Sequence, residues 1–111
     1  LGPAFIRRFH SGQVLYGSRR TYLRKLAVAD FEGVCSNTTL VLYSKDSNVM
    51  RQDFIPVVMT TEAFHAFSKR ESKGSVNPYV NWSDLAKYVF QLPSIEEQKK
   101  INEVKEKMLV E

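Results

Sequence analysis

The sequence has little cysteine and no long apolar run. Its 111 residues include one cysteine, Cys35, so no disulfide can form within the chain. We interpret Cys35 as a small buried residue and expect a reducing, cytoplasmic location. No apolar run approaches the ~18 residues of a membrane-spanning helix, and the first residues show no signal-peptide pattern. We therefore predict a protein with no disulfide framework and no membrane partner.

The sequence also lacks the residue groupings that enzymes use. It contains no phosphate-binding loop, no zinc-protease helix motif, no nucleophile elbow and no cysteine and histidine spacing for a metal. Its carboxylates fit turns and helix caps better than an acid–base pair. We therefore expect no catalytic residues, no metal and no cofactor in this chain. An enzyme whose site forms only between subunits stays open as an alternative, but no residue requires one.

What the sequence does contain is an ordinary globular composition with a small excess of positive charge. Hydrophobic residues make up 43% and charged residues 25% of the chain, fractions typical of a folded domain. A chain of 111 residues is long enough for a single core. The net charge of +4 favours a polyanionic partner such as nucleic acid, although charge alone does not require one.

Apolar patterns predict an α+β fold in which a small mixed β-sheet packs against one or two helices. Strands are predicted at residues 12–17, 37–43 and 88–92, where apolar and β-branched residues stand between turn-forming residues. A helical pattern begins at Asp53, which we predict as its N-cap, and continues to residue 70 as one helix or two. No internal repeat or second domain is visible.

A separate helix is predicted at the C-terminal end, from residue 95 onward. Ser94 and Glu97 have the spacing of a capping box, in which each side chain bonds the backbone N–H of the other residue. Ile101, Val104 and Met108 follow at helical intervals and form a narrow apolar stripe. Because such a stripe is too narrow to bury the helix in a globule, we expect the helix to project and to pair with a partner helix.

Residues 19–25 form the first candidate binding segment, with four cations in seven positions. Arg19, Arg20 and Arg24 carry forked guanidinium groups, which suit phosphate oxygens and the O6/N7 edge of guanine. Tyr22 lies between these arginines in the sequence. The alternative interpretation is a solvated loop, or a strand edge that is kept basic to prevent pairing with another strand.

Residues 69–77 form the second candidate binding segment, in which cations at a helix end precede short polar residues. Gly74 permits a close backbone approach, and Lys73 can reach phosphate or guanine. Ser75 and Asn77 offer short donors and acceptors, and an asparagine can pair with adenine. The alternative is helix capping, with cations that complement the helix dipole and Gly74 as the stop, and it is compatible with binding.

Two aromatic residues follow the second segment. Tyr79 and Trp82 both have rings that can stack on nucleic-acid bases. Because an aromatic pair beside a connecting segment more often belongs to the core, we predict Trp82 as a core residue. The role of Tyr79 stays open between stacking and packing.

Five segments of the chain follow one another in a characteristic order. They are residues 12–15 (GQVL), 36–42 (SNTTLVL), 61–64 (TEAF), 72–77 (SKGSVN) and 92–101 (LPSIEEQKKI). In this order they resemble the target recognition domain of the specificity subunit of type I restriction-modification systems. The similarity extends over residues 11–107, and the last segment is its most specific part. Gln13 departs from the family pattern, which usually has an acid at that position.

The resemblance implies a module that reads the sequence of double-stranded DNA and has no activity of its own. It also implies two partners: a modification subunit that binds S-adenosylmethionine and methylates adenine, and a restriction subunit that cleaves DNA with ATP. Residues 1–93 would form the recognition domain, and residues 94–111 the start of a spacer helix. The implied DNA contacts are Arg19, Arg20, Arg24, Lys73, Gly74, Ser75 and Asn77, and the implied partner interface is Ile101, Val104 and Met108.

Two alternatives remain open within this resemblance. A whole specificity subunit carries two recognition domains and two spacer helices, so we expect this chain to be a fragment, a half-subunit or a remnant gene product. The competing function is a non-catalytic protein-interaction module. Such a module would form a homodimer through its last helix, or bind the modification subunit, without reading DNA.

Overall fold

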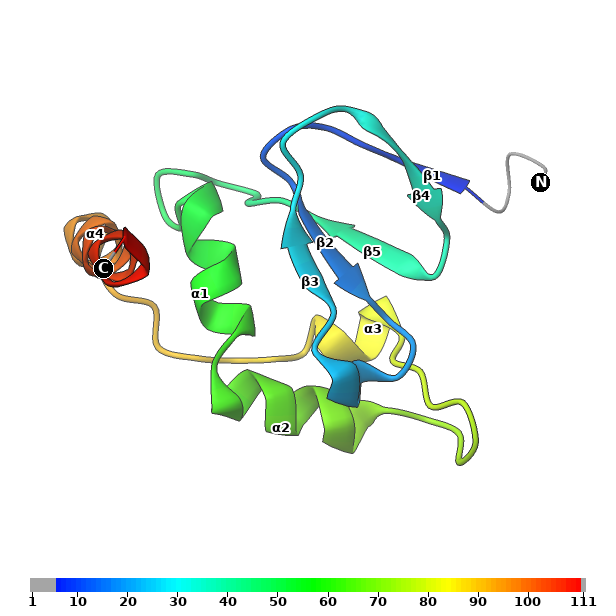
Figure 1. Cartoon of the computed structure of the whole chain (residues 1–111). Helices are drawn as coiled ribbons and strands as arrows, with labels where there is room; N and C mark the ends of the chain where they lie inside the picture. Colours follow the sequence, from blue (N-terminus) through cyan, green and yellow to red (C-terminus); the bar gives the residue numbers. More distant parts are fainter. Residues whose placement is uncertain (1–5, 111) are drawn as a thin grey trace.

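The structure, a computed structural model, describes residues 6–110 and confirms the α+β class (Figure 1). None of the helices in this part of the chain is long and apolar enough to cross a membrane. The elements, in chain order, are β1 Ile6–Phe9, β2 Val14–Gly17, the 3-10 turn η2 Thr21–Leu23, β3 Leu26–Val28, β4 Gly33–Ser36, β5 Thr39–Leu42, the 3-10 turn η3 Gln52–Phe54, α1 Ile55–Met59, α2 Glu62–Glu71, α3 Trp82–Leu85 and α4 Ile95–Val110.

The strands form two small antiparallel sheets instead of one mixed sheet. In the larger sheet β2 is central and pairs with both β3 and β5, so Val14 lies opposite Val28 on one side and Leu42 on the other. In the smaller sheet β1 pairs with β4. The sequence pattern does not predict β1 or β4, because both strands leave most of their side chains partly or fully exposed.

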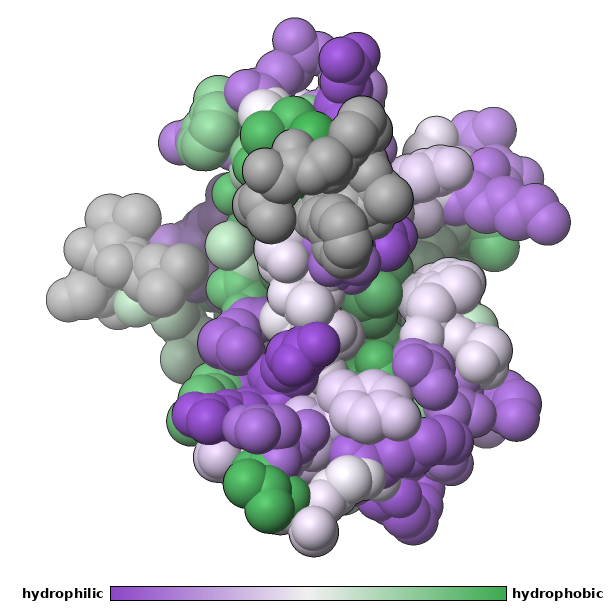
Figure 2. Space-filling model, turned by 90° about the vertical axis from the view of Figure 1, so that its right-hand side faces the viewer, coloured by the Kyte–Doolittle hydropathy of each residue, from purple (hydrophilic) through white to green (hydrophobic). Residues whose placement is uncertain are grey.

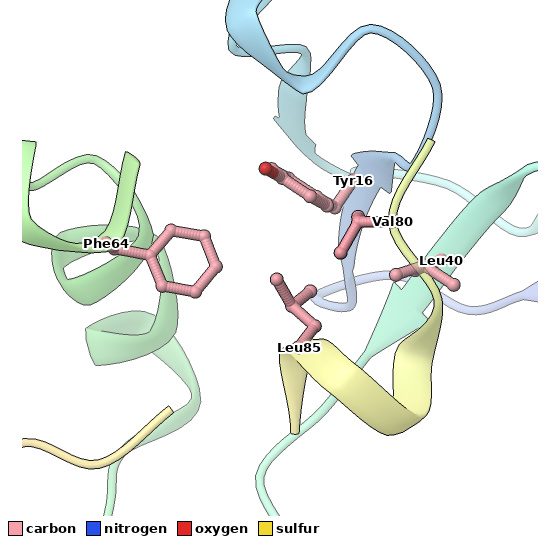
Figure 3. Close-up of a cluster of buried hydrophobic side chains, with 5 residues drawn as sticks. All are labelled: Tyr16, Leu40, Phe64, Val80 and Leu85. Atoms are coloured by element: carbon pink, nitrogen blue, oxygen red, sulfur yellow. The ribbon is translucent and has the colours of Figure 1, made fainter. Parts of the chain in front are cut away.

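The main core lies between the three-stranded sheet and helices α2 and α3. Phe64 of α2 points toward the sheet, where its ring meets Tyr16 of β2 edge to face, with ring centroids 5.9 Å apart (Figure 3). Leu40 of β5 and Leu85 of α3 are buried in the same cluster with Val80. Burying one large apolar side chain contributes about 1.5–3 kcal/mol. This cluster therefore holds α2, and the segment that follows it, against β2.

The predicted helix that starts near residue 53 is two helices, α1 and α2. Thr61 is the N-cap of α2, where its hydroxyl accepts a hydrogen bond from the backbone N–H of Phe64 at 3.2 Å. Such a cap provides the new start that separates α2 from α1. The prediction that Asp53 is an N-cap is wrong, because Asp53 lies inside η3 and its carboxylate pairs with Arg51.

Two further predictions are wrong. Residues 88–92 run toward α4 without pairing with any strand of the described chain, so they form no strand. Trp82 is 54% exposed at the start of α3, whereas Leu85, one turn later, fills the core. Apolar residue types alone decide neither where a pairing strand lies nor which side of a four-residue helix faces inward.

Helix α4 lies on the opposite side of the domain from the loop that follows α2 (Figure 1). The predicted capping box at its start is confirmed. Ser94 donates to the Glu97 carboxylate from its backbone N–H and its hydroxyl, and the Glu97 N–H donates back to Ser94 Oγ at 3.2 Å. Gln98, in the first turns of α4, is fully buried and bonds three backbone groups outside the helix. It therefore anchors α4 to the domain.

Candidate functional site

Two segments far apart in the sequence meet at one surface. The first, which we call the arginine turn, is residues 19–24 around η2, and the second is the 73–79 loop after α2. The backbone N–H of Arg20 donates to the carbonyl of Pro78 at 2.7 Å and joins the two segments. The two end residues of the loop exchange backbone hydrogen bonds of 2.7 and 2.9 Å, so the loop closes on itself. We call the result the joined surface.

A chain of buried and partly buried hydroxyl groups holds the arginine turn against α2. Thr21 Oγ1 lies 2.9 Å from Ser72 Oγ, and Ser72 Oγ donates to the Ser68 carbonyl. Because Ser72 uses its single hydroxyl proton in that bond, Thr21 is the donor to Ser72. Ser68 Oγ and Tyr16 OH, 2.6 Å apart, extend the chain into the core, where burial raises the pKa of Tyr16. Thr21 and Ser68 are fully buried, so these bonds determine the position of the turn.

Unusual backbone conformations shape both segments. Arg20 and Arg24 flank η2 with φ angles of 53° and 51°, in the left-handed region that residues other than glycine rarely adopt. Such conformations persist where neighbouring contacts hold them, and they concentrate at functional sites. Gly74 has a φ angle of 89°, so any side chain there would strain the loop. Gly74 is not a helix stop, because α2 ends at Glu71 and Ser72 is its C-cap.

Two of the predicted DNA-contacting cations are paired with carboxylates. Arg24 donates two hydrogen bonds of 2.8 Å to Glu62, and Lys73 Nζ lies 2.9 Å from Asp84 Oδ2. These hydrogen bonds hold the pKa of both carboxyl groups below its usual range. Glu62 and Asp84 therefore stay ionised at neutral pH and compensate their partners. Among residues 6–110 no three His, Cys, Asp or Glu side chains gather as a metal site.

Arg19 and Arg20 differ from those two cations because no carboxylate of the described chain pairs with them. Arg20 Nη2 donates to the neutral side-chain oxygen of Asn77 at 3.0 Å. Ser75 and Asn77 are exposed in the loop. The lower part of the molecular face on the loop side is largely hydrophilic (Figure 2). The joined surface thus combines uncompensated positive charge with short polar side chains.

The structure brings the two candidate segments together, which their positions in the sequence do not indicate. Arg19, Arg20, Gly74, Ser75 and Asn77 belong to the joined surface without a compensating acid. Arg24 and Lys73 belong to the same two segments, but each is held by an ion pair. The sequence pattern misses the contact between Thr21 in the turn and Ser72 at the end of α2, because it spans 51 positions and no local signal marks it.

The predicted partner face of α4 is exposed. Ile101, Val104 and Met108 have exposed fractions of 38%, 57% and 73%. The exposure of the stripe rises along the helix from Ile101, which lies three positions after the buried Gln98, to Met108. Apolar residues at these intervals are the usual seam of paired helices.

The chain matches known proteins over most of its length. A family model for the type I restriction modification DNA specificity domain matches residues 7–106, and the chain belongs to this family. The resemblance inferred from the five segments is therefore confirmed. The chain is also 30% identical over 93 residues to the type I restriction enzyme EcoDI specificity subunit of Escherichia coli. That match covers 84% of the chain and 20% of the relative, so the chain spans a small part of the relative's length.

Proposed function

We propose that this chain is the DNA-reading part of a type I specificity subunit. Double-stranded DNA binds across the joined surface, and the chain itself catalyses no reaction. A modification subunit and a restriction subunit supply methylation and cleavage, and the assembly works in the cytoplasm. Family membership and the similarity to the EcoDI specificity subunit support this proposal. In this scheme residues 1–93 are the recognition domain and residues 94–111 begin the spacer helix.

The observation that carries the proposal is the joined surface itself. Arg19 and Arg20 are free of acidic partners in the described chain, and arginine forks bind both phosphate oxygens and base edges. Gly74 allows the loop backbone to approach a duplex closely. Arg24 and Lys73 contact DNA only after exchanging their carboxylate partners for phosphate, so we assign them a smaller contribution.

Binding of duplex DNA across a salt series tests this function. Each phosphate contact contributes about −0.9 to the slope of log affinity against log salt. The variant Arg19→Ala should therefore flatten the slope by about one. The matched control is Lys99→Ala, because Lys99 is an exposed cation of α4 on the other side of the domain. If Arg19→Ala and Lys99→Ala both keep the wild-type slope, DNA does not bind at the joined surface.

The exposed stripe of α4 favours a second role, protein interaction. We propose that Ile101, Val104 and Met108 either pair with a second spacer helix, for example in another copy of this chain, or dock on the modification subunit. A buried carboxylate in such a seam is strongly unfavourable, so Val104→Asp should abolish the association seen by analytical ultracentrifugation. The control Lys100→Asp changes the charge next to the seam residue Ile101.

Charge reversal in the arginine turn, compared with Val104→Asp, separates the two roles. If the chain is an interaction module without DNA readout, Arg19→Glu and Arg24→Glu leave every measured interaction unchanged, whereas Val104→Asp removes it. If the chain reads DNA, Arg19→Glu removes duplex binding while the association of α4 persists. Association that survives Val104→Asp would contradict the proposed helix seam.

A further inference from the structure

Arg20 is held at three points on the joined surface. Its backbone N–H donates to Pro78, its carbonyl accepts from the N–H of Leu23 at 2.9 Å, and its side chain donates to Asn77. These contacts support a left-handed backbone that a non-glycine residue rarely adopts. A guanidinium group on a flexible surface side chain samples many rotamers, and fixing it before binding removes part of that entropic cost. The geometry is that of a side chain positioned in advance of its ligand.

The pair of side chains presents hydrogen-bond donors outward. The amide oxygen of Asn77 already accepts from Arg20 Nη2 at 3.0 Å. The remaining groups are mostly donors: the other N–H groups of the Arg20 guanidinium and the amide NH₂ of Asn77, beside one free lone pair of the Asn77 oxygen. Both residues are exposed, so these donors are accessible to a ligand.

We propose that Arg20 and Asn77 act as one reading unit that selects a guanine in the major groove, an inference that rests on the proposed DNA-binding function. Guanine presents two acceptors there, N7 and O6, which match a surface made mostly of donors. Adenine and cytosine each present an amino donor, and thymine presents one acceptor beside a methyl group. Reading of adenine by Asn77, as the residue type alone suggests, would have to share the amide oxygen with Arg20, which already uses one of its two lone pairs.

The first experiment is selection of bound duplexes from a randomised library by the full chain, followed by sequencing. The wild-type chain should enrich sites with a required guanine at one position. Arg20→Lys keeps the charge but loses the fork, and Asn77→Ala loses the partner, so both should relax the base preference at that same position. The control Lys99→Ala, at an exposed cation of α4, should keep the preference. Circular dichroism confirms that each variant is folded.

The second experiment uses the wild-type chain alone, so it does not depend on the folding of a variant. Replacing the selected guanine by 7-deazaguanine removes the N7 acceptor and should weaken binding about tenfold, within the range for loss of a bidentate contact. The same replacement at a guanine outside the site should have no effect. Full affinity for the substituted duplex, or an enriched adenine at the position that Arg20→Lys relaxes, would overturn the reading unit while DNA binding stands. Failure of the wild-type chain to retain any duplex at low salt would overturn the proposed function itself.

Discussion

The joined surface and the base of α4 lie on opposite sides of the domain and are held in opposite ways (Figure 1). Many small contacts tie the arginine turn to the 73–79 loop and to α2, through backbone groups and a chain of hydroxyls. One fully buried side chain, Gln98, makes three of the hydrogen bonds that tie α4 to the segments before it, and Asn102 adds one to Asp53 at 3.1 Å. Distributed contacts tolerate the loss of one member, whereas a concentrated anchor does not.

The free energy of unfolding that is lost when one hydrogen-bonding side chain is removed differs between the two regions for this reason. Gln98 Oε1 accepts from the Arg51 N–H at 2.8 Å, and Gln98 Nε2 donates to the carbonyls of Val49 and Pro93 at 3.0 and 2.9 Å. Removing the amide deprives three partly buried backbone groups of this partner, and an unsatisfied buried group costs about 1–3 kcal/mol. Beneath the arginine turn, in contrast, removal of the Thr21 hydroxyl leaves Ser72 with its other bond, to the Ser68 carbonyl.

The largest expected effect is that of Gln98→Ala, which breaks the anchor of α4. We expect the free energy of unfolding to fall by about 3 kcal/mol, because three partly buried backbone groups lose a hydrogen-bond partner together. Urea unfolding followed by circular dichroism measures the change. Lys99→Ala, at the adjacent exposed position, should stay within about 0.5 kcal/mol of the wild type. Equal stability of the two variants would refute the concentrated anchor.

A smaller effect is expected for Thr21→Val, which removes one tie of the joined surface and nearly preserves side-chain volume. The free energy of unfolding should fall by about 1 kcal/mol, the net contribution of one hydrogen bond. The neighbouring Tyr22→Phe is the control, since Tyr22 is exposed. The same urea titration compares both variants. A loss from Thr21→Val as large as that from Gln98→Ala would show that the joined surface is not held by distributed contacts.

The smallest effect is expected for Glu62→Gln, which releases Arg24 from its ion pair. Exposed pairs of this kind contribute up to about 1 kcal/mol. Duplex affinity at low salt should rise up to about fivefold, and the salt slope should steepen, because Arg24 becomes free to contact phosphate. The control Glu71→Gln removes the same charge from the end of α2, outside any ion pair of the described chain. A rise of equal size in both variants would reflect net charge and not the release of Arg24.

The pH dependence of this ion pair has a definite sign. Arg24 lowers the pKa of Glu62, so the carboxylate is charged at neutral pH and takes up a proton only as the pH falls below the usual range of a glutamic acid. The stabilisation by the pair is present above that range and is lost on acidification through the lowered pKa. Between pH 5 and 8, the pair should therefore contribute no change in duplex affinity.

Contacts between residues that lie only a few positions apart were predictable from the sequence. The capping box of Ser94 and Glu97 is such a contact, and so is the β-branched run that becomes β5. The same kind of pattern misled at residues 88–92, because an apolar run forms a strand only where another strand can pair with it. Trp82 misled for a related reason, since its ring type does not determine which side of α3 it occupies.

The sequence by itself determined the α+β class, the start of α4 and membership of the specificity-domain family. Composition, capping residues and the order of motifs can all be read along the chain without knowledge of its packing. Only the tertiary structure decided which arginines keep their charge uncompensated. Arg20 meets Asn77 across 57 positions and Arg24 meets Glu62 across 38. Both arginines flank the same turn with nearly the same backbone conformation. The packing of α2 and its following loop around the turn gives one of them an amide and the other a carboxylate.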